Sequence, residues 1–129
     1  MSAADELTRV RPADRQTADP TPGKVREQAI DVDGLWSGLV RTEPGVTSGW
    51  HHHGEHATAV YVIEGTVRLE FGPGGAQAVD AGPGDFVLIP KRAVHRESNV
   101  GTTASQEVVT RSGTGPLTVN VDGPAPSSA

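Results

Sequence analysis

The chain has 129 residues, a length that suits a single domain able to bury its own hydrophobic core. It contains no cysteine, which excludes a disulfide framework, a thiolate metal site and a cysteine nucleophile. The formal net charge is -5 and the basic residues are scattered, which argues against nucleic-acid binding. No signal-peptide pattern or apolar window of about 20 residues is present, so we expect a cytoplasmic protein without a membrane partner.

The chain divides into an arm, a β-rich domain and a tail. Residues 1–24 are polar and interrupted by prolines, so we expect an extended or mobile arm that could add a strand to a neighbouring sheet. Short apolar runs separated by glycine and proline across residues 25–121 predict a single all-β domain of about nine or ten strands. The expected strands are Val25–Val32, Leu35–Thr42, Val46–His53, Ala59–Ile63, Thr66–Phe71, Ala76–Val79, Asp85–Ile89, Val94–Ser98, Glu107–Arg111 and Leu117–Val121. Residues 122–129 are expected to form a flexible tail.

Alternation along these strands indicates which side chains share a face. Glu64 and Gly65 predict a tight hairpin between Ala59–Ile63 and Thr66–Phe71, because Gly65 can adopt the positive φ that such a turn needs. The faces expected to line the interior are mainly aliphatic. The residues assigned by this parity are Thr58, Val60 and Val62 on one face, Val67, Leu69 and Phe71 on another, and Phe86 and Leu88 alternating with Val87 and Ile89.

All five histidines lie in two short segments, four of them within residues 50–56 and the fifth at His95. In an extended strand His51 and His53 point to one side and His52 points to the other. His95 belongs to a later strand and could meet the first pair across a barrel. Three converging neutral imidazoles would suit one divalent transition metal, such as Fe, Mn, Ni, Zn or Cu.

The histidines belong to two longer sequence motifs. The first motif, G-x5-H-x-H-x4-E-x6-G, is matched by Gly45, His51, His53 and Gly65, with Thr58 at the glutamate position. The second motif, G-x5-P-x-G-x2-H-x3-N, is matched by Gly84, Pro90, His95 and Asn99, with Arg92 at its second glycine. In this order and spacing the two motifs resemble those of the cupin family. The resemblance implies a single-domain jelly-roll β-barrel (a double-stranded β-helix) that holds a metal through His51, His53 and His95. Asn99 is interpreted as a structural turn residue.

The threonine at position 58 changes the expected ligand set. A neutral hydroxyl is a poorer ligand for a divalent ion than a carboxylate, so this substitution opens a coordination position. Glu55 or His56 could supply a fourth ligand from the loop, or both could be solvated loop residues, and coordination rules alone do not decide. A three-histidine site would leave two or three positions for water, oxygen or a chelating substrate.

The resemblance implies two classes of function. A three-histidine cupin is similar to dioxygenases that cleave C–C bonds in small molecules, whereas isomerases and lyases on this fold use the metal as a Lewis acid. The alternative is a non-catalytic module that binds or senses a small molecule, and the fold itself does not choose between them. We also expect a homodimer, because open sheet edges invite pairing. Residues that could lie near the pocket mouth, each expected to be structural or exposed, are Trp50, Tyr61, Arg92 and Glu97.

Overall fold

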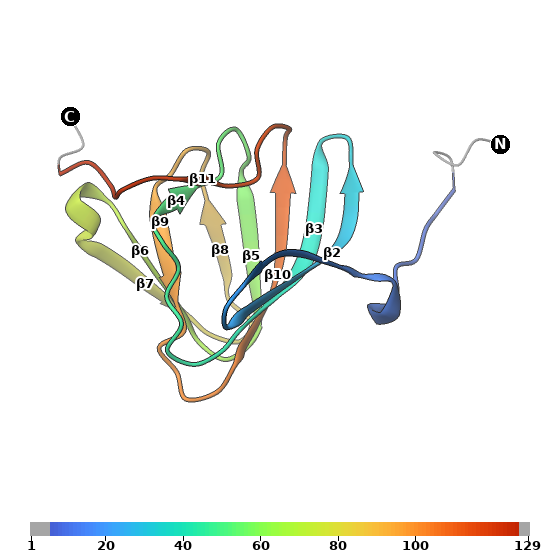
Figure 1. Ribbon diagram of the computed structural model, residues 1–129, viewed down its shortest axis with the longest axis horizontal. Helices are drawn as coiled ribbons and strands as arrows, with labels where there is room; N and C mark the ends of the chain where they lie inside the picture. Colours follow the sequence, from blue (N-terminus) through green and yellow to red (C-terminus); the bar gives the residue numbers. More distant parts are fainter. Residues whose placement is uncertain (1–5, 127–129) are drawn as a thin grey trace.

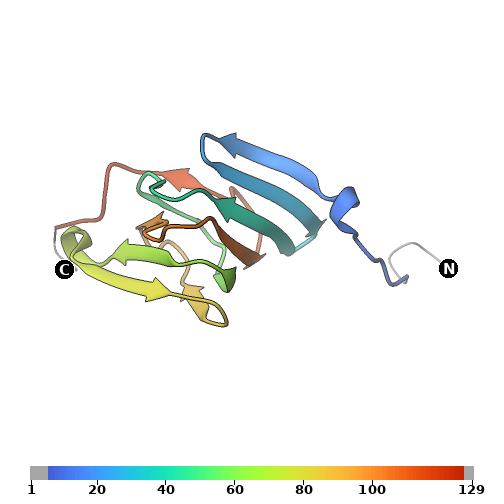
Figure 2. The same ribbon diagram turned by 90° about the horizontal axis from the view of Figure 1, so that it is seen from below.

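The computed structural model describes residues 6–126, which form two antiparallel sheets facing each other (Figures 1 and 2). The six-stranded sheet has the order β1-β2-β3-β10-β5-β8, and the five-stranded sheet has the order β11-β4-β9-β6-β7. The strands of the first sheet are β1 (Gln16–Thr21), β2 (Lys24–Val32), β3 (Leu35–Thr42), β5 (Thr58–Glu64), β8 (Phe86–Ile89) and β10 (Ser105–Ser112). Those of the second are β4 (His51–His52), β6 (Val67–Phe71), β7 (Gln77–Ala81), β9 (His95–Ser98) and β11 (Val119–Asn120). No helix in this part of the chain is long and apolar enough to cross a membrane.

The path of the chain confirms the expected all-β jelly-roll fold class. From β3 onward the chain passes from one sheet to the other at almost every connection, and only β6 and β7 are consecutive strands of one sheet. Strands β3 and β10, distant in sequence, pair in register from Thr42 opposite Ser105 to Leu35 opposite Ser112. The two sheets are not closed into a barrel, because β8 and β7 end their respective sheets without pairing to each other.

The prediction of a hairpin at Glu64 and Gly65 is wrong. Strand β5 pairs with β10 and β8, whereas β6 pairs with β7 and β9, so this turn carries the chain between sheets. Gly65 does have a positive φ of 79°. A Cβ atom at Gly65 would lie 2.7 Å from Cα of Ser105, so the turn packs directly against the backbone at the start of β10. The glycine therefore serves a sheet-crossing corner, for which its lack of a side chain is as necessary as its φ.

The ends of the domain differ from the sequence expectation. Residues 16–21 of the expected arm form β1, which pairs with β2 of the same chain. The expected strand Val46–His53 shortens to two residues, preceded by an isolated bridge between Thr47 and Ser98. In the described part of the tail, the carbonyl of Ala125 accepts a hydrogen bond of 2.7 Å from the backbone N–H of Gly74. Residues 1–5 and 127–129 of the expected arm and tail lie outside the described residues.

The core lies between the sheets and follows the expected alternation. Thr58, Val60 and Val62 are all buried on the inner side of β5, and Ile89 is buried on β8. Phe86 and Leu88 point outward, with 76% and 71% of their surface exposed. The buried apolar cluster consists of Trp36, Val40, Val60, Val62, Val67, Leu69, Ala81, Ile89 and Val109. Several polar side chains share this interior, and they define the site.

Candidate metal centre

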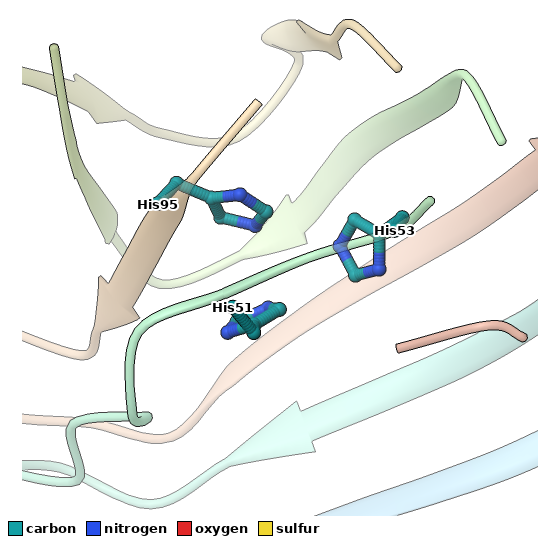
Figure 3. Close-up of side chains that lie close together, drawn as sticks. All are labelled: His51, His53 and His95. Atoms are coloured by element: carbon teal, nitrogen blue, oxygen red, sulfur yellow. The ribbon is translucent and has the colours of Figure 1, made fainter. Parts of the chain in front are cut away.

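Three histidines gather on the inner face of the five-stranded sheet, with their rings turned toward one another (Figure 3). His51 lies in β4 and pairs directly with His95, the first residue of β9, while His53 follows β4 on the same side as His51. One ligand nitrogen of each ring lies within 4.8 Å of the other two. The three residues are 7%, 3% and 2% exposed in the order His51, His53 and His95. The structure thus brings together the three residues that the sequence motifs predicted.

Each ring is held in the orientation that metal binding requires. The Nδ1 atoms of His51, His53 and His95 lie 2.8, 2.8 and 2.9 Å from the backbone carbonyl oxygens of Gly49, Leu117 and Ala93. A carbonyl oxygen can only accept, so each Nδ1 carries the hydrogen and each Nε2 keeps its lone pair. Nε2 of His95 is buried and has no hydrogen-bond partner within residues 6–126. Such backbone bonds to the far nitrogen are characteristic of metal-binding histidines.

The local environment keeps these rings in the form that binds metal. Burial lowers the pKa of His51, and this effect outweighs the nearby Glu97 carboxylate. Burial also lowers the pKa of His53, to about 3, and the neighbouring Arg111 guanidinium adds to the shift. Both imidazoles are therefore neutral at physiological pH, and a neutral imidazole is the ligand form for Zn, Fe, Ni and Cu. The donor set and its geometry fit a divalent transition metal.

The other histidines and the loop glutamate lie elsewhere. His52 is turned away from the cluster, and its Nδ1 accepts a hydrogen bond of 3.0 Å from the N–H of Gly54. Glu55 is 60% exposed at its side chain and forms an ion pair of 2.5 Å with Arg92. The buried His56 ring contacts two backbone carbonyls, those of Ser112 at 2.8 Å and Gly115 at 3.0 Å. The structure brings neither Glu55 nor His56 into the cluster as a fourth ligand.

Thr58 stands at the glutamate position of the first motif and faces the interior. It is 1% exposed, and its Oγ1 has no hydrogen-bond partner among the described residues. Thr58 and His53 both line an interior cavity of about 30 Å³, whose wall also contains Glu97, Glu107 and Arg111. A cavity of this size is large enough for one water molecule, which could satisfy the threonine hydroxyl.

Two acidic residues near the cluster, the buried Glu107 and the half-buried Glu97, were not predicted as metal ligands. Oε1 of Glu97 lies 2.8 Å from Nζ of Lys24 and 3.9 Å from Nε2 of His51. Burial alone would raise the pKa of Glu97, but the positive charge of Lys24 acts against burial, and this pKa lies well below its usual range. The spacing of His95 and Glu97 could have revealed that Glu97 lies on the same side as the histidine cluster, because alternate residues of a strand share a face. Lys24 could not have been found, since it lies at the boundary of the expected arm.

Glu107 is the second of these acidic residues. It is 5% exposed on the inner face of β10, and its Oε1 has no hydrogen-bond partner within the described chain. Burial raises the pKa of Glu107 to about 7, and the negative charge of Glu97 contributes in the same direction, while Ser105 and Lys24 act in the opposite direction. Its alternation with Val109 in the sequence indicates an inward position.

An apolar pocket of about 360 Å³ opens beside the cluster, where β8 of one sheet approaches β6 and β7 of the other. His95 is the one ionisable residue in its wall. The remaining wall consists of Leu69, Phe71, Val79, Val87, Leu88, Ile89, Pro90 and Ala93. Its volume and apolar lining are typical of a small-molecule site, and the failure of the two sheets to close leaves it accessible.

The second motif has two further structural roles here. Arg92 adopts a φ of 59°, the left-handed conformation that a glycine at this motif position would reach more easily. Asn99 is 2% exposed, and its side chain donates to the carbonyls of Thr42 and Thr103 and accepts from the N–H of Gly101. The interpretation of Asn99 as a structural residue is consistent with these bonds.

Comparison with solved structures identifies several similar folds. KdgF from Halomonas sp. aligns with a TM-score of 0.71 and 19% identity, covering 84% of this chain and 96% of that chain. The polyketide cyclase RemF from Streptomyces resistomycificus aligns with a TM-score of 0.74 and 22% identity, covering 90% and 86%. Oxalate decarboxylase from Bacillus subtilis, a protein with Mn(II) centres, aligns with a TM-score of 0.70 and 20% identity, covering 82% of this chain and 30% of that chain. At these identities the likeness shows the fold alone.

Sequence comparison defines the family. No curated protein sequence matches the chain significantly. The pattern of the Cupin domain matches residues 38–110, which is more than half of the chain and includes all three clustered histidines. The motifs, the jelly-roll topology and this match agree, and the chain belongs to the cupin family.

Proposed function

We propose that this protein is a metal-dependent enzyme that acts on a small organic molecule. His51, His53 and His95 would hold one divalent transition metal, with Fe, Mn, Ni, Zn and Cu as the candidates. The observation that carries this proposal is the set of three Nδ1 bonds to backbone carbonyls, which leave a lone pair on Nε2 of each ring, in a cluster whose ligand nitrogens lie within 4.8 Å of one another. The stability of the fold does not require three neutral imidazoles to cluster with each Nδ1 bonded to a backbone carbonyl, whereas metal binding does.

The surroundings of the cluster indicate the class of substrate. The apolar pocket that reaches His95 would hold a compact apolar body of one small molecule. A metal held by three histidines keeps positions for chelating oxygens of that molecule and supplies Lewis-acid or oxygen-activating chemistry. Enolic, diketone and aromatic compounds combine these two features. A dioxygenase-like reaction on such a compound is the activity we propose first.

A non-oxidative isomerase or lyase is the second candidate, and Glu107 is the observation that favours it. Such reactions require a group that gives or takes a proton near pH 7. Glu107 lines the same cavity as His53 and has a pKa of about 7, which suits a proton carrier. Its buried carboxyl would exchange a proton with a water molecule in that cavity.

Turnover distinguishes these proposals from a non-catalytic binding module. Untagged protein would be loaded separately with each candidate metal and incubated with a panel of small diketones, enols and catechols. Oxygen consumption with one metal would support the dioxygenase proposal, and product formation without oxygen would support the isomerase or lyase. Tight binding of a compound by the metal-loaded protein without turnover under any condition would instead indicate a binding or sensing module.

The homodimer and the cytoplasmic location remain predictions. Strands β1 and β8 end the six-stranded sheet, and β8 exposes Phe86 and Leu88 beside Tyr61 and Ile63 of β5. A second copy of this chain covering this surface would remove several exposed apolar side chains from water. Sedimentation at micromolar concentration should show twice the monomer mass, and a monomer would contradict the prediction.

A further inference from the structure

We propose that Glu97 supplies the carboxylate ligand that this chain lacks at position 58, and that Lys24 holds that carboxylate beside the histidine cluster until a metal binds. This inference rests on the proposed metal site and identifies its fourth protein ligand. It differs from both loop candidates, because Glu55 is paired with the exposed Arg92 and His56 is bonded to backbone carbonyls.

The first support is position. His95 and Glu97 are alternate residues of β9, so their side chains project from the same face of the sheet, as those of His51 and His53 do. Oε1 of Glu97 lies 3.9 Å from Nε2 of His51. Two donor atoms bound to one zinc-like ion, each about 2.0–2.2 Å from it, are at most about 4.4 Å apart. The Glu97 carboxylate is therefore already within the distance that joint ligation with His51 requires.

The second support is charge. Neutral imidazoles and the Thr58 hydroxyl provide no negative charge to a divalent ion, whereas Glu97 is an anionic oxygen donor next to them. Burying an ion pair within a protein is often no more stabilising than burying apolar side chains of the same size. The Lys24 and Glu97 side chains are nevertheless only 6% and 23% exposed. A ligand role explains why a carboxylate is kept at this place.

Binding requires a limited movement of Glu97. The group whose ligand atoms all lie within 4.8 Å of one another contains the three histidines and not Glu97. The carboxylate must therefore turn toward the centre of the cluster when a metal binds, and Lys24 competes with the metal for it. Removing the charge of Lys24 should consequently strengthen metal binding, because the lysine ammonium then no longer competes with the metal for the carboxylate.

The test compares two variants that leave no lysine unpaired. Lys24→Gln removes the cation, and the double variant Lys24→Gln/Glu97→Gln also removes the carboxylate. Chelator-stripped proteins would be titrated with Mn²⁺ and with Zn²⁺ by calorimetry, with melting temperatures recorded without metal. We expect Lys24→Gln to bind at least as tightly as the wild type, and the double variant to bind at least tenfold more weakly than Lys24→Gln.

Two control variants and one spectrum test whether the loss of affinity in the double variant comes from a lost metal ligand. Glu70→Gln removes a carboxylate that pairs with Arg96 on the neighbouring strand, and it should leave metal affinity unchanged. Adding Thr58→Glu to the double variant restores a carboxylate at the motif position, and it should recover most of the lost affinity. The absorption spectrum of the Co²⁺-loaded protein should change between Lys24→Gln and the double variant, because one ligand is lost.

Two results would overturn the proposal. Equal affinity of Lys24→Gln and the double variant, with binding still abolished by His95→Ala, would leave a three-histidine site without Glu97. A loss of affinity that Thr58→Glu does not recover, with an unchanged Co²⁺ spectrum, would show that the Lys24–Glu97 pair only supports the fold. Metal binding that survives His95→Ala would instead contradict the metal site itself, so the two failures are distinguishable.

Discussion

Replacing Glu107 with glutamine should stabilise the metal-free protein at pH 8 and have little effect at pH 5. The pKa of this carboxyl is about 7 in the folded protein, compared with an ordinary value of 4.5. A pKa raised by folding means that the folded chain keeps a proton that the unfolded chain has lost, so stability decreases as pH rises from about 4.5 to 7. At about 1.4 kcal/mol for each pH unit, ionising Glu107 costs the folded protein about 3.5 kcal/mol. Glutamine has nearly the same shape and never ionises.

Urea unfolding in the presence of a chelator would measure this effect at several pH values between 5 and 8. The quantity to compare is the difference in unfolding free energy between Glu107→Gln and the wild type, because contributions of other titrating groups largely cancel in it. That difference should grow by about 3 kcal/mol in favour of the variant from pH 5 to pH 8. A difference that does not change with pH would show that Glu107 ionises without cost, and that burial does not control its proton.

Three further predictions test parts of the fold. Asn99→Ala should lower the unfolding free energy by about 3 kcal/mol in chemical denaturation, since three hydrogen bonds to backbone groups are lost at about 1 kcal/mol each; a loss below about 1 kcal/mol would contradict its role. Gly65→Ala should cost at least about 1 kcal/mol, because its φ is 79° and Ser105 occupies the space of a Cβ atom; an unchanged melting temperature would contradict the sheet-crossing corner. Val62→Ala should cost about 2–3 kcal/mol, since Val62 is 0% exposed, whereas the same change at the exposed Val100 should have little effect.

Local sequence patterns predicted the elements that depend on short-range chemistry. Strand β3 coincides with the expected range Leu35–Thr42. Alternation also placed Thr58 and Val62 inside correctly. Local patterns could not predict which strands pair or where the chain crosses from one sheet to the other. Gly65 supports a hairpin and a sheet-crossing corner equally well, and the choice depends on Ser105, which is 40 residues later in the chain.

In the candidate site, too, local sequence predicted some features, while others depend on contacts between distant residues. Alternate spacing identified His51 and His53 as a pair on one face, and the second motif identified His95; the structure brings the three together. The carbonyls that orient these rings could not be predicted, since Leu117 contacts His53 through a backbone atom that every residue possesses. Similarly, the partner of Glu97 is Lys24, which reaches it from another sheet. Local sequence patterns do not predict ion pairs between residues this far apart in the chain.

The metal content of untagged protein tests the central claim most directly. Elemental analysis after purification and reloading should find one divalent transition metal per chain in the wild type and almost none in His95→Ala. His52→Ala is the matched control, because His52 lies in the same segment but faces away from the cluster, and it should keep full occupancy. X-ray absorption of a zinc-loaded sample should show nitrogen neighbours at about 2.0–2.1 Å. Full metal occupancy in His95→Ala, or no stoichiometric metal in the wild type after reloading, would contradict the three-histidine centre.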